Sequence, residues 1–238
     1  MSEWKTERFW QEATVEPEGQ GFKVLLDGRA VKTPAKAPLI VPVEALAQQI
    51  AAEWSAQDKM IDPTSMPFTR AANAAIDKVS AQHDEVAELI AAYGDSDLLC
   101  YRAAQPEALV ARQAASWDPF LDWARDEQGI ELKVFTGVMH CPQPPESLAR
   151  IAQITGAMNA YELTAFHDLV SLTSSFVLGL AAARQLRTAD EIWEISRIDE
   201  SWQEEQWGGD DEAAAATMVK RQAFVCAAQL FKIVAKPD

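Results

Sequence analysis

The hydrophobic period of the chain changes just after Pro42, and this change restricts the possible folds more than any other feature. Before it, short apolar runs are separated by Gly and Pro, which is typical of a small antiparallel sheet. Beyond it, apolar residues recur three or four positions apart, beginning with Val43, Leu46, Ile50 and Trp54. The pattern predicts an α+β protein, in which a small N-terminal antiparallel β-rich domain precedes a larger all-helical C-terminal domain.

The first forty residues predict four short strands around a tight hairpin. Asp27 and Gly28 give a strong two-residue turn signal between the apolar run 22–26 and its partner run 29–33. Residues 14–15 and 39–41 supply the other two strands. We expect a β-rich domain over residues 1–60 and a helical domain over residues 61–238.

The rest of the chain predicts a series of helices. The third helix stops at Gly94, and Asp118-Pro119 leaves open a fresh helix start in the stretch that ends at Gly129. Residues 131–135 read as a strand or an extended connector. Residues 163–183 are apolar nearly all round, which indicates a central buried helix. The expected helices cover residues 43–54, 68–79, 86–93, 107–128, 146–157, 160–186, 189–207 and 212–234.

Composition excludes several classes of partner. The 238 residues carry 36 acidic and 21 basic side chains, a net charge of −15, which repels nucleic acid and anionic membranes. Ser and Thr interrupt the longest apolar run, residues 169–183, which is too short to span a bilayer. Three Cys without a CxxC pair, and an N-terminus without an apolar signal core, favour a reducing cytoplasm. We expect no nucleic-acid partner, no membrane insertion and a monomer.

One motif of the sequence is similar to a catalytic motif. Residues 94–98, Gly-Asp-Ser-Asp-Leu, look like the nucleophile block of GDSL-type esterases, but the chain shows no downstream base for Ser96. The alternative is a helix that ends at Gly94, with Asp95 or Ser96 capping the next turn. Phosphate-binding loops are absent, and the three His have no ligand spacing. We therefore expect no catalytic residue, no metal and no cofactor.

The segment 199–212 sets two Trp among acidic side chains and ends in a Gly-Gly break. Trp offers a large contact area at little rotamer cost, so this composition suits a surface that grips another protein. The alternative is a helix end whose Trp side chains face the core while its carboxylates face water. The sequence leaves both interpretations of Trp202 and Trp207 open.

Four sequence blocks occur in order along the chain: RFW at 8–10 with GFKVLLDGRAVKTP at 21–34, IAAEW at 50–54 with IDP at 61–63 and MPFT at 66–69, YGDSDLLCYR at 93–102, and DESWQ at 199–203 with WG at 207–208. Together these blocks resemble the chaperone family that assembles the catalytic head of F-type ATP synthase by binding its alpha subunit. The chain departs from the family pattern at three places: Trp10 stands where tyrosine is expected, Ala30 where proline is frequent, and His140-Cys141 lies in a loop that is usually more apolar.

The resemblance implies a protein without enzyme activity that holds the new alpha subunit until the beta subunit arrives. Such proteins occur in mitochondria and in related bacteria, so we expect a cytoplasmic bacterial member. The client contacts are expected in the acidic-aromatic segment, at Glu200, Trp202, Glu204, Glu205 and Trp207, with Asp210 and Glu212 as steering charges.

A second candidate surface comprises Asp95, Asp97 and Arg102, for which a capped, salt-bridged turn is the alternative. Two rival functions stay open at this point. One is a serine hydrolase that uses Ser96, and the other is a permanent structural adaptor.

Overall fold

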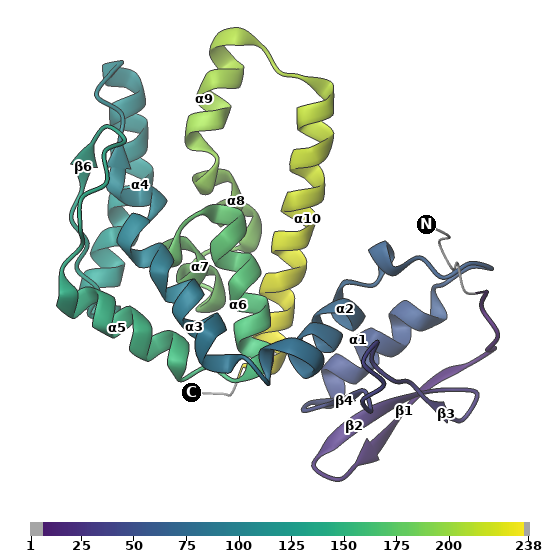
Figure 1. Ribbon diagram of the computed structural model, residues 1–238. Coiled ribbons are helices and arrows are strands. Elements are labelled where there is room, and N and C mark those ends of the chain that lie inside the picture. The colour runs from purple at the N-terminus through teal and green to yellow at the C-terminus, as the bar shows by residue number, and fades with distance from the viewer. Residues whose placement is uncertain (1–6, 236–238) are drawn as a thin grey trace. The chain divides into compact units, whose positions relative to one another are not determined.

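An antiparallel sheet of four strands lies at the N-terminal end of the computed structural model, which describes residues 7–235 (Figure 1). The strand β2 pairs with β1 along one edge and with β3 and β4 along the other. Asp27 and Gly28 both have positive φ, 46° and 78°, as the expected two-residue hairpin turn requires. The predicted sheet is confirmed, with strands β1 (Ala13–Glu18), β2 (Gly21–Leu26), β3 (Arg29–Ala30) and β4 (Ile40–Val41).

Helix α1 (Glu44–Ser55) packs against β1 and β2 through the apolar stripe that the sequence predicts. Leu46 and Ile50 are completely buried on this face. The ring of Trp10 meets that of Trp54 edge to face at 5.1 Å, and its indole N–H donates to the Trp54 carbonyl at 3.3 Å. Buried Trp10 of the RFW block therefore packs against half-buried Trp54 of the IAAEW block in α1.

Glu53 stabilises the start of the next helix, α2 (Pro67–Ala74). Its carboxylate accepts hydrogen bonds from the backbone N–H groups of Phe68 at 2.7 Å and Thr69 at 2.8 Å. A helix begins with N–H groups that have no partner inside the helix, and a carboxylate there is favoured. The IAAEW and MPFT blocks are thus joined by a cap. Two short elements flank α2, the 3₁₀ turn η1 (Pro63–Ser65) and the π-helical turn η2 (Ala75–Val79).

The chain forms two compact units whose boundaries do not follow chain order. Unit 1 takes in described residues 7–83, 159–164 and 229–235, and unit 2 takes in residues 84–158 and 165–228. The first unit thus runs past the sheet to His83 and recruits two later segments. The expected division at residue 60 stays a prediction about independently folding domains.

Unit 2 is mainly helical and surrounds α7 (Phe176–Ala183), in which every residue is buried. Trp117, Phe166, Trp193 and Phe224 are large buried side chains of this unit. Its elements are α3 (His83–Ala91), η3 (Ala92–Ser96), η4 (Leu98–Cys100), β5 (Tyr101–Arg102), α4 (Glu107–Gln128), β6 (Phe135–Thr136), α5 (Pro145–Gly156), α6 (Ala160–Thr173), α7, α8 (Ala189–Ser196), α9 (Ile198–Trp207) and α10 (Asp211–Val234), of which α3, α6 and α10 also reach into unit 1.

Two of the long predicted helices are divided in the structure. The stretch 160–186 breaks after Thr173, because Ser174 adopts a left-handed φ of 53° and Ser175 caps a new helix by accepting from the Leu178 N–H. The stretch 189–207 breaks at Arg197 between α8 and α9. The central buried helix is therefore α7 together with the end of α6, rather than one helix over residues 163–183.

The structure decides one open alternative and corrects two further expectations. Pro119 does not restart a helix, since α4 continues through it to Gly129, which ends α4 in the left-handed conformation. Gly94 is not a C-cap; it lies buried inside η3, where a Cβ would collide with the side chain of Ile151. The C-terminal part is not all helical, because β5 and β6 form a short parallel pair.

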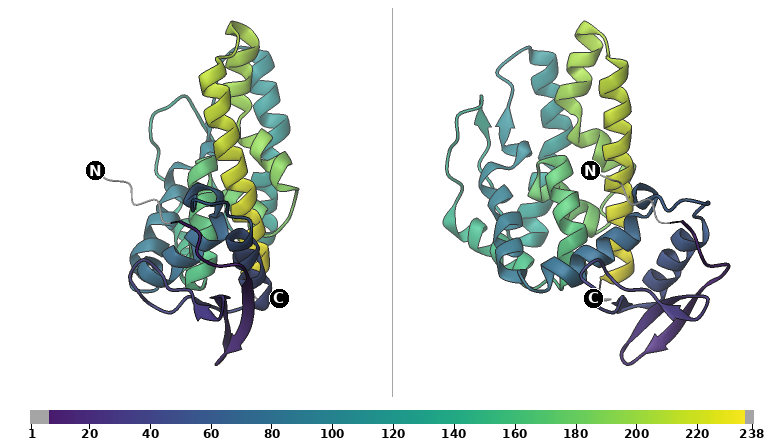
Figure 2. Two further views of the ribbon diagram at one scale, coloured as in Figure 1. Left: turned by 90° about the vertical axis from the view of Figure 1, so that its right-hand side faces the viewer. Right: turned by 45° about the vertical axis from the view of Figure 1, so that its right-hand side comes forward.

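The helices α9 and α10 are antiparallel and are joined by the loop 208–210 (Figures 1 and 2). Gly208 takes a positive φ of 88° directly after α9, a conformation that L side chains rarely adopt. Asp210 then accepts from the backbone N–H of Ala213 at 2.8 Å and caps α10. The Gly-Gly break of the sequence is thus the turn of a helical hairpin.

Candidate functional site

Arg112 of α4 holds α9 in place. Its guanidinium donates to both carboxylate oxygens of Glu205, at 2.8 and 2.9 Å, and lies 4.9 Å from the ring centre of Trp202. The hydrogen bonds from Arg112 keep the pKa of Glu205 below its usual value. Trp202 is half-buried. Glu205 and Trp202, two of the expected client contacts, are therefore already engaged within the protein.

A second row of polar contacts fixes the junction of α8 and α9 on α4. The Gln113 amide donates to Asp199 at 2.6 Å, while its oxygen accepts from the Ala103 N–H at 2.9 Å. The Trp117 indole donates to the Ile195 carbonyl at 2.9 Å. Gln113 and Trp117 are buried, so each contact satisfies a polar group that would be costly to leave unpaired. These contacts hold the junction of α8 and α9 against α4.

The far end of the α9–α10 hairpin is different, because it exposes large apolar side chains to solvent. Trp207 is 79% exposed, and Met218 and Val219 on α10 are 70% and 72% exposed. This answers the open question about the tryptophans: Trp207 faces water, whereas Trp202 is half-buried under Arg112. Besides Glu205, which Arg112 binds, four acidic side chains of the same hairpin are also exposed, namely Glu204, Asp210, Asp211 and Glu212. We name these seven residues the hairpin surface.

Exposed apolar side chains among carboxylates are typical of protein-binding surfaces. Monomeric proteins avoid large apolar patches unless the patch binds something, and Trp is the side chain most enriched at the centre of protein interfaces. The hairpin surface presents no convergent reactive groups.

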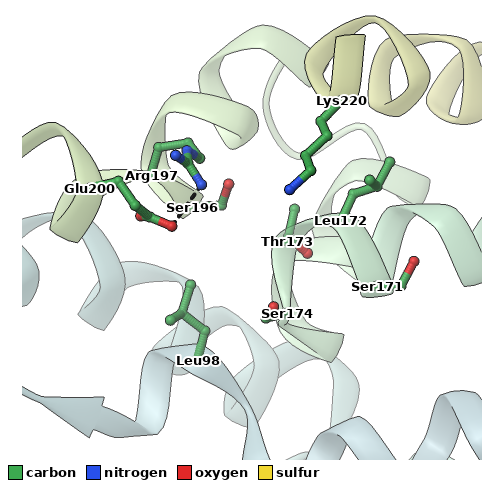
Figure 3. A pocket seen from close by; sticks show the side chains of 9 residues that line it. All are labelled: Leu98, Ser171, Leu172, Thr173, Ser174, Ser196, Arg197, Glu200 and Lys220. Carbon is green, nitrogen blue, oxygen red and sulfur yellow. Dashed lines mark hydrogen bonds and ion pairs between the residues drawn. The ribbon is translucent and has the colours of Figure 1, made fainter. Parts of the chain in front are cut away.

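Glu200 points into a cavity of about 320 Å³ rather than to the hairpin surface (Figure 3). Arg197 donates to Glu200 at 2.6 Å across the first turn of α9. Lys220 of α10 reaches toward the same cavity. The remaining lining comes from Ser196, from Leu98 and from residues 171–174 at the end of α6.

Asp97, part of the second candidate surface, is completely buried and acts as a structural cap. Its carboxylate accepts from the N–H groups of Leu99 and Val177, both at 2.9 Å, and from the Ser175 hydroxyl at 2.8 Å. Burial raises the pKa of Asp97 to about 6 against the opposing effect of these donors. The carboxylate therefore joins η4 to the start of α7, and it is not available to a partner.

Arg102 is also buried, which excludes it from a docking surface. It donates to the Leu99 carbonyl at 2.7 Å and to Asp118 at 2.8 Å, and it lies 5.2 Å from the ring centre of Trp117. The block 93–102 is thus the capped, salt-bridged turn that the sequence left as an alternative. The cap comes from Asp97, not from Asp95 or Ser96.

Asp95 is the only one of these three residues near the surface. It accepts from the Gln143 N–H at 2.9 Å and contacts His140 at 3.0 Å, which ties the loop 137–144 to η3. Ser96 is exposed and, within the described residues, makes no hydrogen bond to His140. His140 is therefore not placed to activate the Ser96 hydroxyl.

Sequence reasoning missed the cations of this region, Arg112, Arg197 and Lys220. Single basic residues at scattered positions carry no pattern, and only the folding of α4, α8, α9 and α10 brings them to the acidic segment. In the part of the chain that the structure describes, no three His, Cys, Asp or Glu side chains gather as metal ligands. Over the same residues, no helix has the length and apolar character required to cross a bilayer.

Several known proteins are similar to this chain in both sequence and fold. The family model described as ATP12 chaperone protein matches residues 7–125. The crystal structure of Atp12 from Paracoccus denitrificans has a TM-score of 0.94, with 44% identity over 98% of this chain and 100% of that chain. An aspartate-to-lysine mutant of the same protein matches equally well.

Two further matches are more distant. The Atu1473 protein of Agrobacterium tumefaciens has a TM-score of 0.91 and 42% identity over 96% of this chain and 86% of that one. The mitochondrial protein atp12 of Schizosaccharomyces pombe is 24% identical over 87% of this chain and 75% of its own length.

The matching family model and the similar solved structures identify the class of this protein as a chaperone. The chain belongs to the ATP12 chaperone family, whose members are assembly chaperones of ATP synthase. This confirms the family resemblance and the α+β fold that the sequence predicts.

Proposed function

We propose that this protein holds the unassembled alpha subunit of F-type ATP synthase and releases it when the beta subunit arrives. The observation that carries the proposal is Trp207, 79% exposed at the end of α9 among carboxylates. An unassembled subunit exposes the apolar surface that its partner later covers. A chaperone that covers this surface first prevents the subunit from associating with itself.

The hairpin surface has the properties that reversible holding requires. Its exposed apolar side chains supply contact area, and its carboxylates attract basic client surfaces while repelling a second copy of the chaperone. Release requires modest affinity, about −8 kcal/mol for a micromolar complex. Glu204, Trp207, Asp210 and Glu212 are the expected residues that remain free for the client, because Glu205 and Trp202 are engaged by Arg112. We place this activity in a bacterial cytoplasm, a placement supported by the bacterial origin of the similar solved structures.

Aggregation of purified alpha subunit tests the proposal. Light scattering is followed after dilution of the subunit from denaturant, with and without a several-fold excess of the chaperone. We expect suppressed scattering and a soluble complex that dissociates when beta subunit is added. Unchanged scattering would contradict the proposal, and a complex that survives excess beta subunit would instead indicate a permanent adaptor.

A further inference from the structure

The cavity beside Glu200 contains more positive than negative charge, in a chain whose net charge is −15. Its ionisable lining groups are Arg197, Lys220 and Glu200. Arg197 and Glu200 already bind each other at 2.6 Å. Lys220 has no hydrogen bond or ion pair with any other described residue. One positive charge is therefore left uncompensated at this cavity.

The walls of the cavity have a mixed character that limits what fits. Leu98 and Leu172 contribute apolar surface, while Thr173, Ser174 and Ser196 contribute polar atoms. Figure 3 shows Lys220 reaching in from α10, opposite the paired Arg197 and Glu200. A volume of about 320 Å³ lies at the lower end of the range for small-ligand sites. It admits one side chain or one chain end, not a folded element.

The backbone on one side of the cavity is held in an uncommon conformation. Ser174 has a φ of 53°, which is rare for a residue other than Gly, and its carbonyl accepts from the Leu98 N–H at 3.0 Å. Asp97 fixes the adjoining start of α7. Such backbone persists only where its surroundings hold it, and it is frequent at binding sites. The wall is therefore preformed.

We propose that this cavity binds one carboxylate group of the client protein between Lys220 and Arg197. A single carboxylate matches the one uncompensated positive charge, whereas a doubly charged phosphate would exceed that charge and would be repelled more strongly by Glu200. The leucines accommodate the methylene groups that precede the carboxylate. This inference rests on the proposed function only for the identity of the client.

Three short peptides test the chemistry on the full-length protein without any client. They are acetyl-leucyl-glutamate amide, acetyl-leucyl-glutamine amide, and acetyl-leucyl-glutamine with a free carboxyl terminus. Each is titrated while the backbone amide signals are followed by NMR. We expect saturable shifts at Ser174, Arg197 and Lys220 with one or both of the carboxylate peptides, which also shows whether a side chain or a chain end is preferred. Equal shifts with the uncharged peptide, or none with any of the three, would overturn the inference.

Lys220→Met provides the matched substitution, because it keeps the side-chain stem and removes the charge. We expect it to abolish the peptide shifts and to weaken binding of the alpha subunit about tenfold. Lys232→Met, which also removes an exposed lysine of α10, is expected to change neither. If the wild-type protein binds the alpha subunit and Lys220→Met binds it equally well, the cavity inference fails while the proposed function stands. If the wild-type protein does not bind the alpha subunit, the proposed function fails. The peptide titration alone then decides whether the cavity binds a carboxylate.

Discussion

Arg112 grips Glu205 through two parallel hydrogen bonds, although 93 residues separate them in the chain. The same guanidinium covers the ring of Trp202. One side chain of α4 therefore orients two residues of α9, while Trp207 at the end of the same helix stays exposed. The contacts of Arg112 therefore anchor Trp202 and Glu205 on α4, whereas Trp207 in the same acidic-aromatic segment stays exposed to solvent.

Arg112→Met is expected to loosen α9 without unfolding the protein. The substitution removes both hydrogen bonds to Glu205 and the cation over Trp202, so backbone amides of residues 198–207 should exchange with deuterium faster. Circular dichroism should show unchanged helix content. Arg125→Met is the matched control, because Arg125 contacts Asp122 and Asp126 within its own helix. Equal exchange in the two variants would show that Arg112 does not anchor α9.

The buried carboxylate of Asp97 predicts an unusual dependence of stability on pH. Its pKa is raised from 3.8 to about 6 in the folded protein, so between these values the folded state keeps a proton that the unfolded state has lost. The stabilisation from this group is complete below about pH 4 and is lost as the pH rises through 6. The total change is on the order of 3 kcal/mol.

Asp97→Asn isolates that contribution, because the amide does not titrate. The free energy of unfolding in urea should be measured for both proteins from pH 4 to pH 7. We expect the advantage of the wild-type protein over the variant to shrink as the pH rises. An advantage that stays constant, or grows with pH, would show that the pKa of Asp97 is not raised.

Gly179 in α7 has no room for a side chain. A Cβ there would lie 2.6 Å from Cγ2 of Val170 and 3.1 Å from its backbone nitrogen. Because backbone atoms cannot move aside cheaply, Gly179→Ala is expected to lower the free energy of unfolding by about 1–3 kcal/mol. Gly156→Ala, in α5, meets no atom within 4 Å and should be neutral or stabilising by up to about 1 kcal/mol. Urea unfolding of both variants checks the contrast, and equal losses would contradict it.

Trp207→Ser should impair client holding while leaving the fold intact. A central interface tryptophan typically contributes about 2 kcal/mol or more, so affinity for the alpha subunit is expected to fall about thirtyfold. Leu89→Ser removes another exposed apolar side chain, 55% exposed on α3, and is the matched control. Light scattering and a titration by calorimetry would measure both. Equal activity of the two variants would place the client contact elsewhere.

The sheet and most helix positions are predictable from sequence because their signals are local. Asp27-Gly28 specifies its turn, and Leu46 and Ile50 mark one face of α1 without reference to any other segment. The break after Thr173 could not be predicted, since an apolar run looks the same whether or not it is interrupted. The break depends on Ser174 and on Asp97, which lies almost eighty residues earlier.

In the candidate site, too, local features are predictable from sequence and long-range contacts are not. The sequence draws attention to Glu204, Trp207 and their acidic neighbours by composition alone, and these residues prove to be exposed. It does not reveal that Arg112 binds Glu205, or that Lys220 and Arg197 share a cavity with Glu200. Ion pairs between helices that are distant in the chain produce no periodic pattern in the sequence. A carboxylate in a sequence motif can therefore be a buried cap, like Asp97, or a free surface charge, like Glu204.

The last helix, α10, supplies residues 211–228 to one unit and residues 229–234 to the other. The unit that contains the N-terminal sheet consequently lacks part of its packing until residues 229–234 have been translated. Domains commonly fold in order as they leave the ribosome, N-terminal parts first. Here residues 7–83 must wait for residues 229–235, which are made more than a hundred residues later. A nascent chain halted before Gln229 would therefore carry a sheet unit whose apolar surface is partly uncovered.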